Sequence, residues 1–170
     1  RARPCRRSNS RWRAGRRLLV YLAWTRLLIP VQLLAVTFGL SLAERLPRFY
    51  HRSCWRLLGI DVEIHGQASA ARPTLFVANH SSYLDIIVLG GLVPASFVAK
   101  TEVADWPFFG TLAKLQRSVL VDRRVRSTAT QRDALLGRLQ AGDNLILFPE
   151  GTRNDGNRVL PFKSALFSVA

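Results

Sequence analysis

Residues 74–92 read TLFVANHSSYLDIIVLGGL, a stretch that passes from a short apolar run through a polar turn into a second apolar run. A β-rich run followed by a helical run is the repeating unit of an α/β domain. The alternation extends in both directions along the chain. We expect strands over 61–65, 74–78, 96–99, 118–121 and 144–148, and helices over 83–92, 106–115 and 128–140. The sequence therefore predicts an α/β fold with a largely parallel sheet flanked by helices.

A histidine stands at the start of the polar turn, where the apolar run ends. Ligands of such sheets gather at the carboxyl ends of the strands, so His80 lies where a site is expected. Asp85, five residues later, can reach back to one imidazole nitrogen and support the imidazolium that forms on proton uptake. The alternative is structural, since Ser82 and Asp85 have the spacing of a capping box, in which Asp85 satisfies backbone donors. These residues alone leave both interpretations open.

A second polar cluster follows the last expected strand. It reads Pro149-Glu150-Gly151-Thr152-Arg153 and again lies at a strand's carboxyl end. A surface turn in which Glu150 and Arg153 pair with each other would explain it without any function. The strand over 118–121 delivers Arg123 to the same edge, and its planar guanidinium suits phosphate oxygens. We expect a base, a carboxylate and guanidinium groups to meet on one rim.

With these motifs the chain resembles the glycerolipid acyltransferase family, best known for its 1-acylglycerol-3-phosphate acyltransferases, over roughly residues 55–167. Residues 79–85 match the family's His-x4-Asp motif, residues 148–153 match its Phe-Pro-Glu-Gly-Thr-Arg motif, and residues 100–110 and 119–123 resemble its middle block. The resemblance implies that His80 deprotonates a lysolipid hydroxyl, which attacks the thioester carbonyl of an acyl donor directly. It also implies that Asp85 supports His80. The residues it assigns to the polar head of the acceptor are Arg123, Glu150, Gly151, Thr152 and Arg153.

The resemblance implies no cofactor, with acyl-CoA or acyl carrier protein as the donor co-substrate. The expected acceptor is a lysophospholipid, 1-acylglycerol-3-phosphate, which would give phosphatidic acid. The chain departs from the family pattern at residues 116–118 and 164–165, where glycine is usual, so another lysolipid such as lyso-ornithine lipid is the alternative acceptor. A non-catalytic, membrane-anchored basic binding protein would explain the arginines but not two ordered motifs. A serine hydrolase would need a Gly-x-Ser-x-Gly elbow, which the sequence lacks.

Charge and hydropathy divide the chain into three regions. It carries 25 Lys and Arg against 11 Asp and Glu, a net charge of +14, and its apolar content of 48% excludes an intrinsically disordered protein. Eight arginines fall in residues 1–17, predicted as a flexible basic arm. Residues 18–58 are predicted as apolar and amphipathic helices that associate with a membrane. Residues 59–170 would form the acyltransferase domain, whose C-terminal part we expect to be missing.

The order of these segments favours a membrane partner. Arginines directly before an apolar run suit an anionic membrane surface rather than nucleic acid, and we expect the cytoplasmic face of the inner membrane. Arg26 and Pro30 interrupt the run, so a kinked helix pair in one leaflet is favoured over a single span. A cleaved signal peptide ranks last. Two cysteines are too few for a disulfide framework or a zinc site, so we predict no metal.

Overall fold

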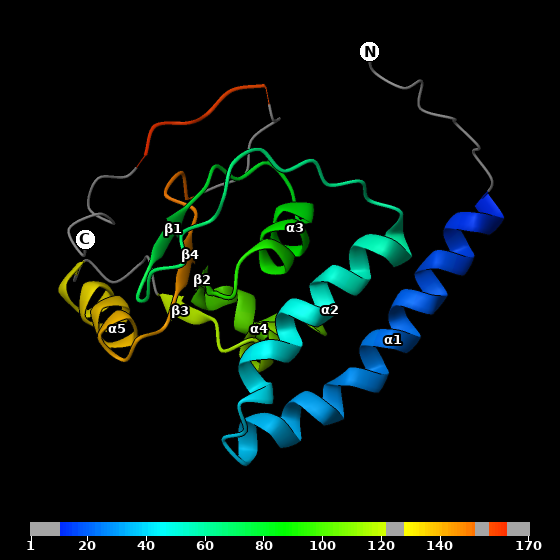
Figure 1. The fold of residues 1–170 in the computed structure, drawn as a ribbon, viewed down its shortest axis with the longest axis horizontal. Coiled ribbons are helices and arrows are strands. Elements are labelled where there is room, and N and C mark those ends of the chain that lie inside the picture. The colour runs from blue at the N-terminus through cyan, green and yellow to red at the C-terminus, as the bar shows by residue number, and fades with distance from the viewer. Residues whose placement is uncertain (1–10, 122–127, 152–156, 163–170) are drawn as a thin grey trace.

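The structure, a computed structural model, describes residues 11–121, 128–151 and 157–162. Two helices come first, α1 (Arg11–Thr37) and α2 (Leu42–Leu58). The remaining elements in chain order are β1 (Leu75–Val77), α3 (Leu84–Leu92), β2 (Ser96–Lys100), the 3-10 helix η1 (Thr101–Asp105), α4 (Phe109–Leu115), β3 (Val119–Val121), α5 (Thr128–Gln140) and β4 (Leu145–Leu147). From β1 onward strands alternate with helices (Figure 1), which confirms the α/β prediction.

The four strands form one parallel sheet in the order β1-β4-β2-β3. The last strand of the described residues, β4, therefore lies inside the sheet, between β1 and β2. Its residues Leu145, Ile146 and Leu147 are all 0% exposed. A strand covered on both faces needs apolar side chains throughout, and this explains the unbroken apolar run in the sequence.

Each face of the sheet has its own apolar cluster, because successive side chains of a strand point to opposite faces. On one face, Leu145 and Leu147 pack with Leu135 of α5. On the other face, Phe97 and Ile146 pack with partly buried side chains of α3. Helices α5 and α3 accordingly lie on opposite sides of the sheet (Figure 1).

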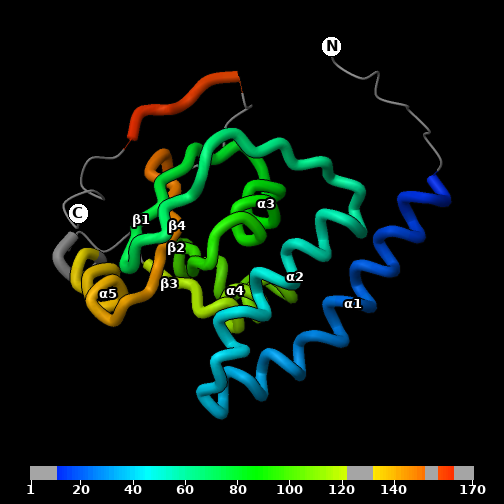
Figure 2. Tube along the Cα trace, in the orientation of Figure 1, coloured from blue at the N-terminus to red at the C-terminus, as the bar shows by residue number. Residues whose placement is uncertain are grey.

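Helices α1 and α2 form a hairpin that lies against α3, with α2 on the inside (Figure 2). Two glycines let α2 and α3 approach closely. A Cβ at Gly90 would lie 2.5 Å from the Cδ2 of His51, and one at Gly91 would overlap the indole of Trp55. That indole donates a hydrogen bond of 2.8 Å to the carbonyl of Ile87 in α3. The hairpin is thus packed directly onto the helix whose first turn carries Asp85.

Helix α1 exposes most of its apolar residues and buries few. Within the described residues it is the one helix long and apolar enough, by length and composition, to cross a membrane. Its exposed large apolar residues are Leu18, Leu19, Val20, Leu22, Leu27, Val31, Leu33, Leu34 and Val36. The buried Gln32 faces the protein instead, where its amide donates to the carbonyls of Ala43 (3.0 Å) and Leu115 (2.8 Å). The side chain of Gln32 therefore links α1 to α2 and α4 by hydrogen bonds.

Three predictions differ from the structure by more than one residue at the end of an element. Helix α1 already begins at Arg11 and continues through Pro30, so residues 11–17 of the predicted flexible arm are helical. Residues 1–10 lie outside the described part. The strand predicted over 61–65 is wrong, because these residues form no strand, and its apolar Ile64 is 59% exposed while Val62 is only half-buried. The helix predicted from residue 106 begins at Phe109, after a tight turn in which the Phe109 N–H donates to the Pro107 carbonyl (2.7 Å).

Candidate active site

Two loops leave the same edge of the sheet from neighbouring strands. Strands β1 and β4 are parallel partners, and the pairing extends one residue further through a bond from the Ala78 N–H to the Leu147 carbonyl (3.1 Å). The loop after β1 carries His80, and the loop after β4 begins with Phe148. The two rings stack with centroids 4.2 Å apart. The structure therefore brings the two sequence motifs together, as their places at strand ends predicted.

His80 and Asp85 form a hydrogen-bonded pair. The imidazole Nδ1 lies 2.9 Å from the carboxylate Oδ2, and the two side chains are 16% and 22% exposed. Asp85 lies in the first turn of α3 and so points back at the loop before it. Because Nδ1 faces the carboxylate, the tautomer with its proton on Nδ1 is favoured and Nε2 is left to accept a proton.

The same carboxylate also holds the turn between them. Asp85 Oδ2 accepts hydrogen bonds from the backbone N–H groups of Ser81 (2.7 Å) and Ser82 (2.8 Å). The Ser82 hydroxyl accepts from the N–H of Leu84 (3.1 Å). The two interpretations left open by the sequence are therefore compatible, because one carboxylate caps the local backbone and contacts the imidazole.

These bonds set the charge state of Asp85. Burial raises the pKa of this carboxyl, but the N–H donors of Ser82 and Ser81 and the contact with His80 outweigh burial and leave the pKa below its usual range. The group is consequently a carboxylate at neutral pH. A fixed negative charge beside an imidazole stabilises the imidazolium that forms when the ring takes a proton.

The loop after β4 places a second carboxyl group at this edge. Glu150 is 3% exposed and follows the fully buried Pro149. Gly151 closes the turn by donating its N–H to the Phe148 carbonyl (3.2 Å), with a φ of +72° that favours glycine. Of the predicted acceptor-binding residues, Glu150 and Gly151 are thus at the expected edge. Arg123, Thr152 and Arg153 lie outside the described residues.

An exposed aromatic cluster includes Tyr83, which lies between His80 and Asp85 in the sequence. The Tyr83 ring lies 6.1 Å from that of Trp106 and 6.5 Å from that of Phe109, and these residues are 41–53% exposed. Exposed aromatic groups suit contact with apolar ligands or a lipid surface. No role was predicted for these residues, although the Trp-Pro-Phe-Phe run at residues 106–109 is recognisable in the sequence as an aromatic segment. In the described part of the chain, no group of three His, Cys, Asp or Glu side chains is placed to hold a metal ion.

Comparison with known proteins gives consistent matches. The model of a family described as Acyltransferase matches residues 60–170. A lyso-ornithine lipid O-acyltransferase of Brucella abortus is 48% identical over 84% of this chain and 54% of its own length. A 1-acyl-sn-glycerol-3-phosphate acyltransferase of Neisseria gonorrhoeae is 36% identical over 66% of this chain and 45% of its own length. The chain spans about half the length of these curated relatives.

A solved structure also matches. It is the 1-acyl-sn-glycerophosphate acyltransferase PlsC of Thermotoga maritima, with a TM-score of 0.63 and 28% sequence identity. The match covers 91% of this chain and 69% of that chain, and so includes the helical hairpin as well as most of the α/β part.

Proposed function

The chain belongs to the acyltransferase family, and from that premise we propose that it transfers an acyl group from an acyl thioester to the free hydroxyl of a lysolipid. The observation that carries the proposal is the pair of His80 and Asp85, in which Nδ1 meets a carboxylate at 2.9 Å and Nε2 is left to act as a base. This pair lies at the carboxyl edge of a parallel sheet, the usual place for a site in such a fold.

The reaction follows from this geometry. His80 Nε2 takes the hydroxyl proton of the lysolipid while the oxygen attacks the thioester carbonyl. The C–O bond of the new ester forms and the C–S bond breaks, and the imidazolium returns its proton to the departing thiolate. Asp85 stabilises the charged ring between these two steps. A direct transfer of this kind needs no covalent acyl-enzyme.

The acceptor is one of two lysolipids. The motifs led us to expect 1-acylglycerol-3-phosphate, whereas the 48% identity to a lyso-ornithine lipid O-acyltransferase favours lyso-ornithine lipid. We assign the polar head of the acceptor to Glu150 and Gly151 together with Arg123, Thr152 and Arg153. Acyl-CoA or acyl carrier protein serves as donor, and no cofactor is required.

The first two helices support action at a membrane. The chain is associated with a membrane through the exposed apolar residues of α1, which fits an acceptor that itself resides in a bilayer. We further propose that the surface is anionic and lies on the cytoplasmic side, where the surplus of positive charge is attracted to acidic headgroups.

The test is an acyl-transfer assay with both acceptors and both donors, on wild type and His80→Ala. His65→Ala is the matched control, because His65 is an exposed histidine paired with Glu63. Loss of general-base catalysis should lower the rate of His80→Ala by about 10²–10⁴-fold and leave the control unchanged. Equal product formation by wild type and His80→Ala would overturn the proposal.

Arg123→Ala and Arg153→Ala should raise the KM for the acceptor more than that for the donor.

A further inference from the structure

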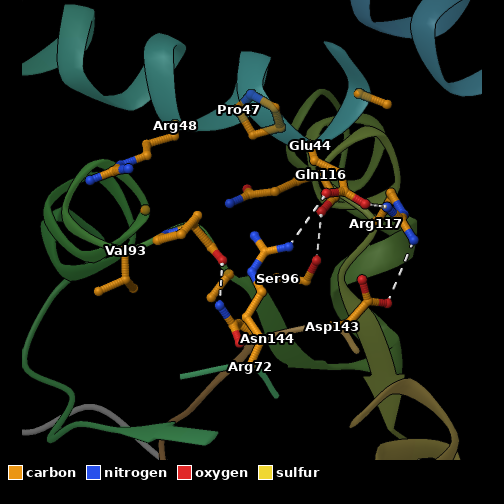
Figure 3. Close-up of a pocket in the computed structure, with 14 residues that line it drawn as sticks. Glu44, Pro47, Arg48, Arg72, Val93, Ser96, Gln116, Arg117, Asp143 and Asn144 are labelled. Carbon is orange, nitrogen blue, oxygen red and sulfur yellow. Dashed lines mark hydrogen bonds and ion pairs between the residues drawn. The ribbon is translucent and has the colours of Figure 1, made fainter. Parts of the chain in front are cut away.

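A groove lined by arginines opens at the amino ends of the strands, at the opposite edge of the sheet from His80. Its walls are α2, the residue Arg72 before β1, and Pro94 before β2, and its volume is about 500 Å³. We call it the arginine groove and define it by Arg45, Arg48, Arg52 and Arg72. A smaller pocket continues from it between α2 and the starts of the strands (Figure 3).

Two of these arginines are held in place by the end of α3. Arg48 donates from Nη2 to the Leu92 carbonyl (2.9 Å) and from Nε to the Gly91 carbonyl (3.4 Å), and Arg52 donates from Nε to the same Gly91 carbonyl (2.8 Å). The last carbonyls of a helix attract cations, which explains this placement. A guanidinium has five N–H donors, so both groups keep donors to spare. Their orientation is fixed before any ligand arrives, which lowers the entropy cost of binding.

The positive charge of the groove is not balanced by its acidic residue. Glu44 faces Arg72 at 3.9 Å and Arg117 at 3.2 Å, and Figure 3 shows Arg72 pointing at it from the middle of the pocket. Among the residues that the structure describes, no carboxylate pairs with Arg45, Arg48 or Arg52. Burial and the neighbouring charge of Arg52 lower the pKa of Arg48, as expected where like charges gather. A bound anion would relieve this repulsion.

The surroundings of the groove favour a lipid over a water-soluble anion. Phe49 lines the groove and is 51% exposed. Its ring lies 6.2 Å from that of Trp24 in α1, so the groove adjoins a helix that exposes many apolar side chains. Guanidinium groups bind phosphate oxygens, and the adjoining apolar side chains suit the chains of the same molecule.

We propose that the arginine groove binds the phosphodiester headgroup of an anionic phospholipid of the bilayer, at a place separate from the acyl acceptor. The site would hold the α1–α2 hairpin at a surface of acidic lipid while His80 works at the other edge of the sheet. It does not depend on which lysolipid is acylated.

The experiment measures binding of the full chain to vesicles of three parts phosphatidylcholine to one part phosphatidylglycerol. The variants are Arg45→Gln and Arg72→Gln, which line the groove from different segments and make no buried contact. Arg56→Gln is the matched control, because it removes the same charge from α2 outside the groove. Each groove variant should lose more than the roughly 5-fold that one basic residue contributes by diffuse attraction to an acidic membrane. The control should lose no more than that amount.

Three results would overturn the proposal. Equal losses in all three variants would show that diffuse charge, and not the groove, attracts the vesicles. Full affinity in the groove variants would show that no lipid headgroup binds there. Groove variants that keep vesicle binding but lose binding to poly-glutamate would assign the groove to an acidic protein. Because binding is measured without turnover, none of these results bears on the acyl-transfer assay.

Discussion

Asp85→Asn is the substitution that most directly tests the chemistry of the His80–Asp85 pair. The asparagine keeps the shape of the side chain and an oxygen for the N–H groups of Ser81 and Ser82, but it removes the negative charge that faces the imidazole. The wild-type carboxyl is ionised at neutral pH because its pKa lies below the usual range, so a full charge is lost. At an effective dielectric constant of about 20, opposite charges about 4 Å apart attract by roughly 4 kcal/mol. This magnitude corresponds to a fall in kcat of roughly 10³-fold.

The assay is acyl transfer at saturating acceptor, with thermal unfolding in detergent to confirm that the variant folds. Ser82→Ala is the control, since it removes the hydroxyl that accepts from the Leu84 N–H and leaves the His80–Asp85 contact intact. It should cost about 1 kcal/mol of stability, as for the loss of a helix-capping side chain, and little activity. If Asp85→Asn folds and retains a kcat within tenfold of wild type, Asp85 only organises the turn and the reasoning fails.

Two further predictions concern the packing of α2 on α3. Burial lowers the pKa of His51 to about 4, against an opposing hydrogen bond with Gln116. Its neutral ring should thus stabilise the fold fully above about pH 6.5, and roughly 3 kcal/mol should be lost as the pH falls from there towards 4. Urea unfolding across that interval checks this, and an equally steep dependence in His51→Phe would contradict it. Gly91→Ala should cost about 1–3 kcal/mol by overlap with Trp55. Gly137→Ala, with nothing within 4 Å of the new Cβ, should stabilise the protein by about 0.4–1 kcal/mol, and equal effects of the two substitutions would disprove the close approach.

The contact between His80 and Asp85 and most strands were predictable from the sequence because their signals are local. His80 and Asp85 are five residues apart, and a short apolar run marks each of the four strands. The failed strand over 61–65 shows the limit of such signals. Its Val62 and Ile64 alternate with charged residues as in a half-buried strand, yet a strand also needs a partner edge and a covered face. The partner edge and the covering side chains are supplied by other parts of the chain, which the local pattern does not contain.

Contacts between residues that lie far apart in the sequence could not be predicted in the same way. His51 looks like one more polar residue of a basic amphipathic helix, and its burial comes from contacts with Gly90 and Phe97, which are distant in the sequence. Gln32 is a single polar residue in a mostly apolar run, and its two carbonyl acceptors come from α2 and from residue 115, far along the chain. Sequence separations of this size leave no local pattern.

The position of β4 in the sheet governs the order in which the protein can assemble during synthesis. Strands β2 and β3 are neighbours and can pair as soon as both have left the ribosome, but β1 is separated from β2 by the place that β4 will occupy. The strand that leads to His80 therefore has no partner in the sheet until residues 145–147 have been translated. Nascent chains that end before this point expose unpaired strand edges, which are prone to aggregate. The edge of the sheet that carries His80 and Glu150 is accordingly completed late, when one short apolar strand enters the centre of the sheet.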